Sequence, residues 1–141
     1  MALFTRMNRA FVNRDFLLAV VLGALTPLGY APFVWFPLPI LTLAGLFWLA
    51  RKATPGRAFL LGWGYAFALF LVGVSWVYIS ISTYGGMPAP IAALATLLFC
   101  AFIALMPGLA LLLATQISST LPASSFGRVA LAMPAAWVLL E

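Results

Sequence analysis

Apolar residues along this chain are grouped in long runs, separated by short breaks rich in polar residues, proline or glycine. The longest uncharged stretch extends from Ala58 to Gly127. Apolar runs of about 20 residues are typical of membrane-spanning helices. The pattern predicts a polar lead at 1–15 and a transmembrane helical domain at 16–141, with helices at 16–29, 35–50, 58–81, 88–117 and 129–141. We therefore expect an all-α integral membrane protein, a polytopic bundle of about five transmembrane segments.

Composition excludes a soluble domain, because only 6% of the residues are charged and 66% are hydrophobic. Soluble domains carry about 25% charged residues. The net charge of +5 does not indicate nucleic acid, since the basic residues lie in groups between apolar runs rather than in a stripe with aromatic residues. These groups are Arg6, Arg9 and Arg14, then Arg51, Lys52 and Arg57, and finally Arg128.

Residues 16–50 contain several Pro and Gly positions and are interpreted as a hairpin with its tip at Tyr30–Phe36. Each arm of 14 to 16 residues reaches only about 21–24 Å, against a hydrocarbon core of about 30 Å. Either the helices extend into their flanks with snorkelling arginines, or the hairpin does not cross completely. A cleaved signal peptide is the alternative, but Pro32 directly follows the small residues that resemble a cleavage site.

The basic residues fix the expected orientation. With five segments, all seven Lys and Arg residues lie on one side, which the positive-inside rule makes the cytoplasmic side. The amino terminus is then inside, and the turns Tyr30–Phe36 and Ser80–Met87 face outward, toward the periplasm in a bacterium. The last run, 129–141, would reach only about 20 Å, so we interpret the chain as a fragment cut inside its fifth helix. Glu141 is then either an intramembrane functional acid or a residue near the outer interface.

Small residues at a spacing of four predict close helix packing in two segments. One series is Ala58, Gly62 and Ala66, and Pro107 should kink the helix that carries the other. The other series consists of Ala92, Thr96, Cys100, Ala104 and Gly108. Cys100 is the only cysteine and lies far from any group that activates a thiol, so its position in this series assigns it to packing.

Catalytic chemistry is poorly represented in this chain. Histidine is absent, and the acidic residues are Asp15 and Glu141. No catalytic dyad or triad, metal cluster or disulfide can be assembled from this inventory. We expect no catalytic residue, no metal and no cofactor in these 141 residues.

The polar and aromatic corner from Ser75 to Pro88 is the best candidate for a binding site. Trp76, Tyr78 and Tyr84 form either an aromatic belt at headgroup depth or, together with Gly85 and Gly86 and nearby serines, part of a site for a lipid headgroup or acyl chain. The two glycines indicate a backbone with positive φ, or one that another group approaches closely. The candidate substrate-binding residues are therefore Trp76, Tyr78, Tyr84, Gly85 and Gly86.

Three stretches in this order resemble a known family. They are GYAPF at 29–33 with WFP at 35–37, SWVYIS at 75–80 with TYGGMP at 83–88, and PAAWVLLE at 134–141. With matching spacing across the chain, they are similar to the amino-terminal membrane part of bacterial apolipoprotein N-acyltransferase. The pieces around Trp76 and Gly85 are fairly specific together.

The resemblance implies an enzyme of the bacterial inner (cytoplasmic) membrane that acts in lipoprotein maturation. Such an enzyme moves an acyl chain from a phospholipid to the amino group of the diacylglyceryl-cysteine that begins an apolipoprotein. It does so through a thioester on a cysteine of a nitrilase-like domain with a Glu-Lys-Cys triad, which has no counterpart in this chain. The fragment would be an inactive membrane platform whose partners are membrane lipid, a phospholipid acyl donor and a diacylated lipoprotein. The alternatives are a small transporter without ion coupling and a structural membrane subunit.

Overall fold

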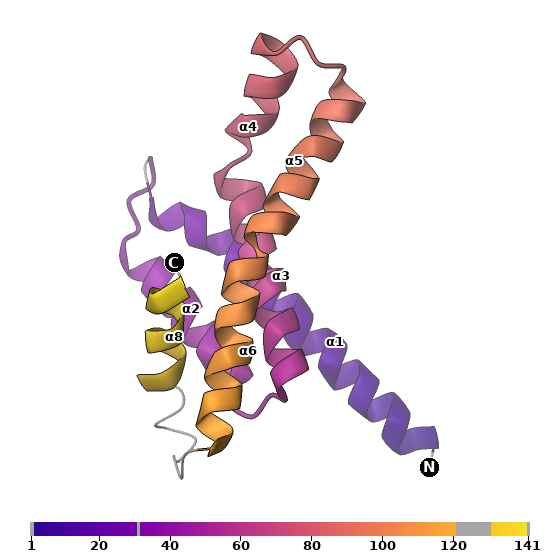
Figure 1. Cartoon of the computed structure of the whole chain (residues 1–141), viewed down its shortest axis with the longest axis vertical. Helices are drawn as coiled ribbons and strands as arrows, with labels where there is room; N and C mark the ends of the chain where they lie inside the picture. The colour runs from indigo at the N-terminus through magenta and orange to yellow at the C-terminus, as the bar shows by residue number, and fades with distance from the viewer. Residues whose placement is uncertain (1, 31, 121–130, 141) are drawn as a thin grey trace.

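The computed structural model describes residues 2–30, 32–120 and 131–140, and these residues are helical apart from short connections (Figure 1). The chain begins with α1 (Ala2–Leu25) and the short 3₁₀ turn η1 (Thr26–Gly29), followed by α2 (Pro37–Ala50) and α3 (Pro55–Gly73). Then come α4 (Trp76–Ile79), the π-helical turn η2 (Ser80–Tyr84), α5 (Ala89–Ile103), α6 (Leu105–Thr120) and α8 (Met133–Leu140).

Helix α3 is the centre of the bundle. It packs most extensively against α1 and α6, and α8 lies beside α6 (Figure 1). The buried core lies where these helices meet α2, and Leu46, Leu61, Tyr65 and Leu111 are among its largest fully buried side chains. The hairpin made by α4 and α5 extends away from this core (Figure 1).

The small-residue series pack as the sequence indicates. Every member of both series is buried. A Cβ added at Gly62 would lie 2.8 Å from the carbonyl oxygen of Pro107 and 3.2 Å from the Cα of Gly108, so α3 and α6 meet almost backbone to backbone. Glycine is needed here because only a residue without a side chain permits this approach.

Helix boundaries differ from the expected ones mainly at three places; in addition, α1 ends at Leu25 rather than at 29, and α2 begins at Pro37 rather than at 35. The lead at 1–15 is not separate from the first helix, because α1 begins at Ala2; the lead contains no Gly or Pro and is rich in helix-forming residues. The predicted helix at 58–81 begins earlier, at Pro55, and is interrupted after Gly73, where Val74 leaves the helical conformation with φ −111° and ψ 17°.

The third difference is the division of the predicted helix 88–117 into α5 and α6. The kink expected from Pro107 is confirmed, and it lies at Ala104, about one turn before the proline. A proline in a helix removes a hydrogen bond to the residue four positions earlier and its ring clashes there, which is the region where α5 ends. Helix α6 continues to Thr120, beyond the expected end at 117, and Arg128 and Glu141 lie outside the described residues.

Two helices within the described ranges are long and apolar enough to cross a membrane. They are Pro55–Gly73, with a mean hydropathy of 1.4, and the kinked pair Ala89–Ile117, with a mean hydropathy of 2.6. Helix α2 is apolar but shorter. Many large apolar side chains are exposed on the helices, among them Leu41, Leu98 and Phe102. These features are consistent with a helical membrane protein, and the count of five spans stays a prediction.

Candidate functional site

The five residues predicted to bind substrate lie together on the α4–α5 hairpin, at its exposed end. Trp76 begins α4, Tyr78 follows two residues later in the same helix, and Tyr84 ends η2. Trp76 is 60% exposed and Tyr84 is 86% exposed, and neither α4 nor η2 contains a buried residue. The hairpin therefore presents these rings outward rather than around a closed site.

The local turn explains both glycines of this corner. Gly86 has φ +65°, in the left-handed region that favours glycine. Gly85 has an ordinary φ of −83°, but a Cβ there would lie 2.6 Å from the carbonyl oxygen of Ile81. The amide of Gly85 donates to the carbonyl oxygen of Ser80 at 3.0 Å, which closes the π-helical turn. Positive φ and close approach are both confirmed, and the approaching group is the chain's own backbone.

Two serines of the corner, Ser75 and Ser82, have a backbone partner three residues earlier in the chain. The hydroxyl of Ser75 donates to the carbonyl oxygen of Val72 at 3.2 Å, and that of Ser82 donates to the carbonyl oxygen of Ile79 at 3.5 Å. We expected polar side chains at this depth to need a partner such as a lipid headgroup. The backbone supplies that partner, so these hydroxyls give no independent indication of a ligand.

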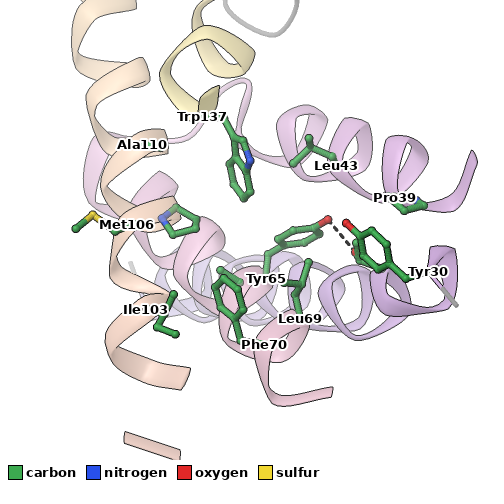
Figure 2. Close-up of a pocket in the computed structure, with 13 residues that line it drawn as sticks. Tyr30, Pro39, Leu43, Tyr65, Leu69, Phe70, Ile103, Met106, Ala110 and Trp137 are labelled. Atoms are coloured by element: carbon green, nitrogen blue, oxygen red, sulfur yellow. Dashed lines mark hydrogen bonds between the residues drawn. The ribbon is translucent and has the colours of Figure 1, made fainter. Parts of the chain in front are cut away.

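A cavity of about 500 Å³ lies elsewhere, inside the bundle (Figure 2). None of the five predicted residues lines it. Its walls are mostly apolar and come from η1, α2, α3, α5, α6 and α8. The lining includes Thr26, Tyr30, Tyr65, Phe70, Met106 and Trp137. This volume is within the range of about 300–1,000 Å³ found for small-molecule pockets.

Three buried hydroxyl groups meet at one wall of this cavity. The Tyr65 hydroxyl lies 2.8 Å from that of Thr26 and 3.2 Å from that of Thr42, and the two threonine oxygens are 2.9 Å apart. Thr26 also donates to the carbonyl oxygen of Leu22, and Thr42 donates to that of Pro39. This hydroxyl cluster joins η1, α2 and α3 within an otherwise apolar bundle.

Sequence reasoning missed the cavity and the hydroxyl cluster. The available signal was weak, because Thr26, Thr42 and Tyr65 are single polar residues inside apolar runs. Buried polar groups find hydrogen-bond partners, so each of them indicated a partner without identifying it. Only the packing of three separate elements brings them together.

Two further features bear on chemistry. Cys100 is buried in α5, and the part of the chain that the structure describes holds no cluster of three metal-binding side chains. Arg57, at the start of α3, forms an ion pair with Asp15 of α1, and both side chains are partly exposed. The ion pair joins α1 to α3.

Comparison with known proteins agrees with these features. The apolipoprotein N-acyltransferase N-terminal domain family matches residues 22–141. The chain is 42% identical over 135 residues to the apolipoprotein N-acyltransferase of Azotobacter vinelandii, which covers 89% of this chain and 24% of the relative. For the enzyme of Ralstonia nicotianae the identity is 45% over 127 residues, covering 88% of this chain and 24% of the relative.

The enzyme of Nitrosomonas europaea is 44% identical over 92 residues, which covers 64% of this chain and 18% of the relative. The chain thus spans about a quarter or less of the length of these curated relatives. The family match includes the helices from α2 to α8 and all of the residues that line the cavity. The chain belongs to the apolipoprotein N-acyltransferase family and corresponds to its amino-terminal domain.

Proposed function

We propose that this chain is the membrane platform of an enzyme that moves an acyl chain from a phospholipid to an apolipoprotein. The acceptor is the amino group of the diacylglyceryl-cysteine at the start of the apolipoprotein. The match of residues 22–141 to the amino-terminal domain of apolipoprotein N-acyltransferase carries this proposal. The apolar helices and the exposed apolar side chains support it, because both substrates carry acyl chains.

The chemical step takes place outside these residues. Cys100 is buried, and the described residues bring no base or acid to it. A thiol needs an activating neighbour to act as a nucleophile. The chain spans about a quarter of its relatives, and we place the thioester-forming cysteine on a domain outside this quarter. The platform binds lipid and positions it, and needs no metal or cofactor for that task.

The proposed location is the bacterial inner membrane, with several crossings and the amino terminus in the cytoplasm. The seven basic residues on one side support this orientation. The corner at Ser75 to Pro88 then faces the periplasm, where a lipoprotein's lipidated cysteine and a phospholipid glycerol both lie. We place Trp76, Tyr78 and Tyr84 in the wall of the acyl-chain entrance beneath the catalytic domain, with Gly85 and Gly86 shaping the turn. The exposure of Trp76 and Tyr84 is compatible with this role.

The test uses the complete open reading frame that contains this chain, expressed in bacteria depleted of their own N-acyltransferase. The mass of a lipoprotein's amino-terminal peptide should increase by one acyl chain. Residues 1–141 expressed alone should give no increase and no acyl adduct on Cys100. An unmodified peptide from cells with abundant, inserted full-length protein would contradict the function. An acyl adduct on Cys100 would contradict the assignment of the chemistry to another domain.

A further inference from the structure

The cavity inside the bundle differs from the surrounding bilayer in one respect, its hydrogen-bonding groups. Its walls include Leu43, Leu69, Phe70 and Ile103, which are as apolar as lipid. Because bilayer and cavity are equally apolar, burial alone gives an acyl chain no reason to leave the bilayer. Any selectivity of the cavity must therefore come from the polar groups that face it, which belong to Thr26, Tyr30, Tyr65 and Trp137.

The hydroxyl cluster offers a ligand no free donor. Each hydroxyl has one proton, and the protons of Thr26 and Thr42 are directed to the carbonyl oxygens of Leu22 and Pro39 at 2.9 and 3.0 Å. With both threonine protons directed elsewhere, Tyr65 donates its own proton to a threonine oxygen, and the oxygen of Thr26 lies 2.8 Å from that of Tyr65. Tyr65 and Thr26 are also almost completely buried. The donors of the cluster are thus all paired within the protein, and none of them is left to bind a ligand in the cavity.

Trp137 is different, because its indole N–H has no hydrogen-bond partner among the residues that the structure describes. The nitrogen makes no hydrogen bond within the described ranges, whereas the indole nitrogen of Trp63 donates to the carbonyl oxygen of Ala101 at 3.1 Å. Figure 2 shows the Trp137 side chain extending from α8 into the cavity. Edge-to-face contacts with Phe47 and Tyr65, at 6.2 and 6.1 Å between ring centroids, hold the ring in place. An indole nitrogen only donates, and in apolar surroundings an unpaired donor is costly.

The residues on the two sides of the cavity fit a ligand that contains an acyl chain. Figure 2 shows Tyr30 and Pro39 on one side of the cavity, with Ile103 and Met106 on the other. Tyr30 is 62% exposed, so this side lies at the edge of the bundle. A ligand that enters here needs an apolar body and, near Trp137, a hydrogen-bond acceptor. It needs no charge, because no charged side chain lines the cavity.

We propose that this cavity binds one acyl chain of an ester-linked glycerolipid, whose ester carbonyl oxygen accepts a hydrogen bond from Nε1–H of Trp137. An ester-linked acyl chain carries a carbonyl oxygen that can accept a hydrogen bond in apolar surroundings. The indole N–H of Trp137, held in place by its ring contacts, is the donor. The inference rests on the proposed function, since it assigns the lipid substrate class a second contact region, away from the corner at Trp76. Trp137 is here a binding residue and takes no part in the chemical step.

The experiment compares ester-linked and ether-linked lipids on the complete protein in detergent micelles. The probe is an ester-linked phospholipid with a photoactivatable diazirine in one chain, and mass spectrometry locates the cross-links. Unlabelled phospholipids with identical head group and chain length compete with it, joined either by ester or by ether bonds. The ether lacks the carbonyl and otherwise matches the ester. Cross-links should fall on lining residues such as Leu69 and Met106, and the ester should compete about three- to tenfold better than the ether.

Two variants assign the preference to the indole N–H. Trp137→Phe keeps an aromatic ring and removes the donor, so it should abolish the difference between ester and ether while the cross-links persist. Trp48→Phe is the matched control, since Trp48 is 60% exposed, lies outside the cavity and stacks with Arg51. It should keep the full preference for the ester.

Equal competition by ester and ether in the unaltered protein would overturn the proposal, and this comparison needs no variant to fold. Absence of cross-links on the lining residues would also overturn it, because another segment of the complete protein would then fill the cavity. Neither result affects the acyl-transfer assay, which measures the mass of the lipoprotein peptide. A failed binding site and a failed function are therefore distinguishable.

Discussion

Single glycines determine how closely the helices of this bundle approach. Gly23 of α1 lies so near α3 that an added Cβ would overlap the carbonyl oxygen of Tyr65. The contact is with backbone, which cannot move aside as a flexible side chain does. Gly56, at the start of α3, has nothing within 4 Å of the same position. These two glycines therefore form a natural pair of test and control.

We predict that Gly23→Ala destabilises the folded protein by about 1–3 kcal/mol, the usual cost of forcing extra volume into a packed site. Alanine has a higher helix propensity than glycine. A loss of stability in Gly23→Ala would therefore come from the overlap between the new Cβ and the backbone of α3. The measurement is the midpoint of thermal unfolding in detergent, followed by circular dichroism. Gly56→Ala should leave the midpoint unchanged or raise it. Equal midpoints for both variants would show that α1 and α3 can separate without cost.

The corner at Trp76 and Gly86 is tested by its effect on transfer. If these residues line the acyl-chain entrance, Trp76→Ala and Gly86→Val in the complete enzyme should slow acyl transfer per inserted molecule. Val at Gly86 is strained by the positive φ, at a cost of roughly 1–2 kcal/mol, and this alters the turn. An aromatic belt predicts something else: abundance falls together with activity, and the normalised rate stays constant. Transfer rate divided by membrane-inserted protein separates these outcomes.

At the scale of whole elements, the small-residue series and the proline kink could be predicted, because spacing along a helix fixes which residues share a face. Ala92 and Gly108 are both buried as expected. The break at Val74 could not be predicted, since the residues before it continue an apolar helical run. The cavity also escaped prediction, because it depends on contacts among five separate helices and a turn.

The hydroxyl cluster connects η1, α2 and α3, and its contribution to the free energy of unfolding can be measured. Tyr65→Phe removes the oxygen that contacts both Thr26 and Thr42. Hydrogen bonds between membrane helices contribute about 0.6 kcal/mol on average and up to about 1.7 kcal/mol. We expect Tyr65→Phe to lower the free energy of unfolding by an amount in this range.

The control for this prediction is a double-mutant cycle with Thr26→Val. Because the two side chains share one hydrogen bond, the double variant should be less destabilised than the sum of the single variants. Thr96→Val serves as an unrelated partner, since Thr96 hydrogen-bonds only within α5, to the carbonyl oxygen of Ala92. Additive effects for Tyr65 and Thr26 would show that the cluster does not couple η1 to α3.

At the scale of the whole molecule, the predicted orientation in the membrane rests on the distribution of charge and is open to a direct test. In a chain with Cys100→Ala, single cysteines at Ser82 and Thr54 should react with a membrane-impermeant thiol reagent from opposite sides, Ser82 from the periplasm. Thr54 should react only after the membrane is permeabilised. Reaction of both positions from one side would contradict the predicted order of spans.

The general class of this fold was accessible from sequence because composition alone excludes a solvated shell. The arrangement of the helices was not, because apolar runs give length and order but no partner. The position of α3 between α1 and α6 depends on Gly23, Gly62 and Gly108 acting together. The candidate site shows the same limit: the corner could be located from its polar residues, whereas Trp137 gave no sign of facing a cavity.

The ion pair between Asp15 and Arg57 also has a consequence for how the chain is made. Asp15 and Arg57 are 42 residues apart in the chain, so a ribosome completes α1 and α2 before it adds the partner of the Asp15 carboxylate. Tyr65, which completes the hydroxyl cluster, is synthesised shortly afterwards on the same helix. Within the nascent hairpin the hydrogen bond between Thr26 and Thr42 can already form, whereas the ion pair of Asp15 and the contacts of Tyr65 are added only when α3 emerges.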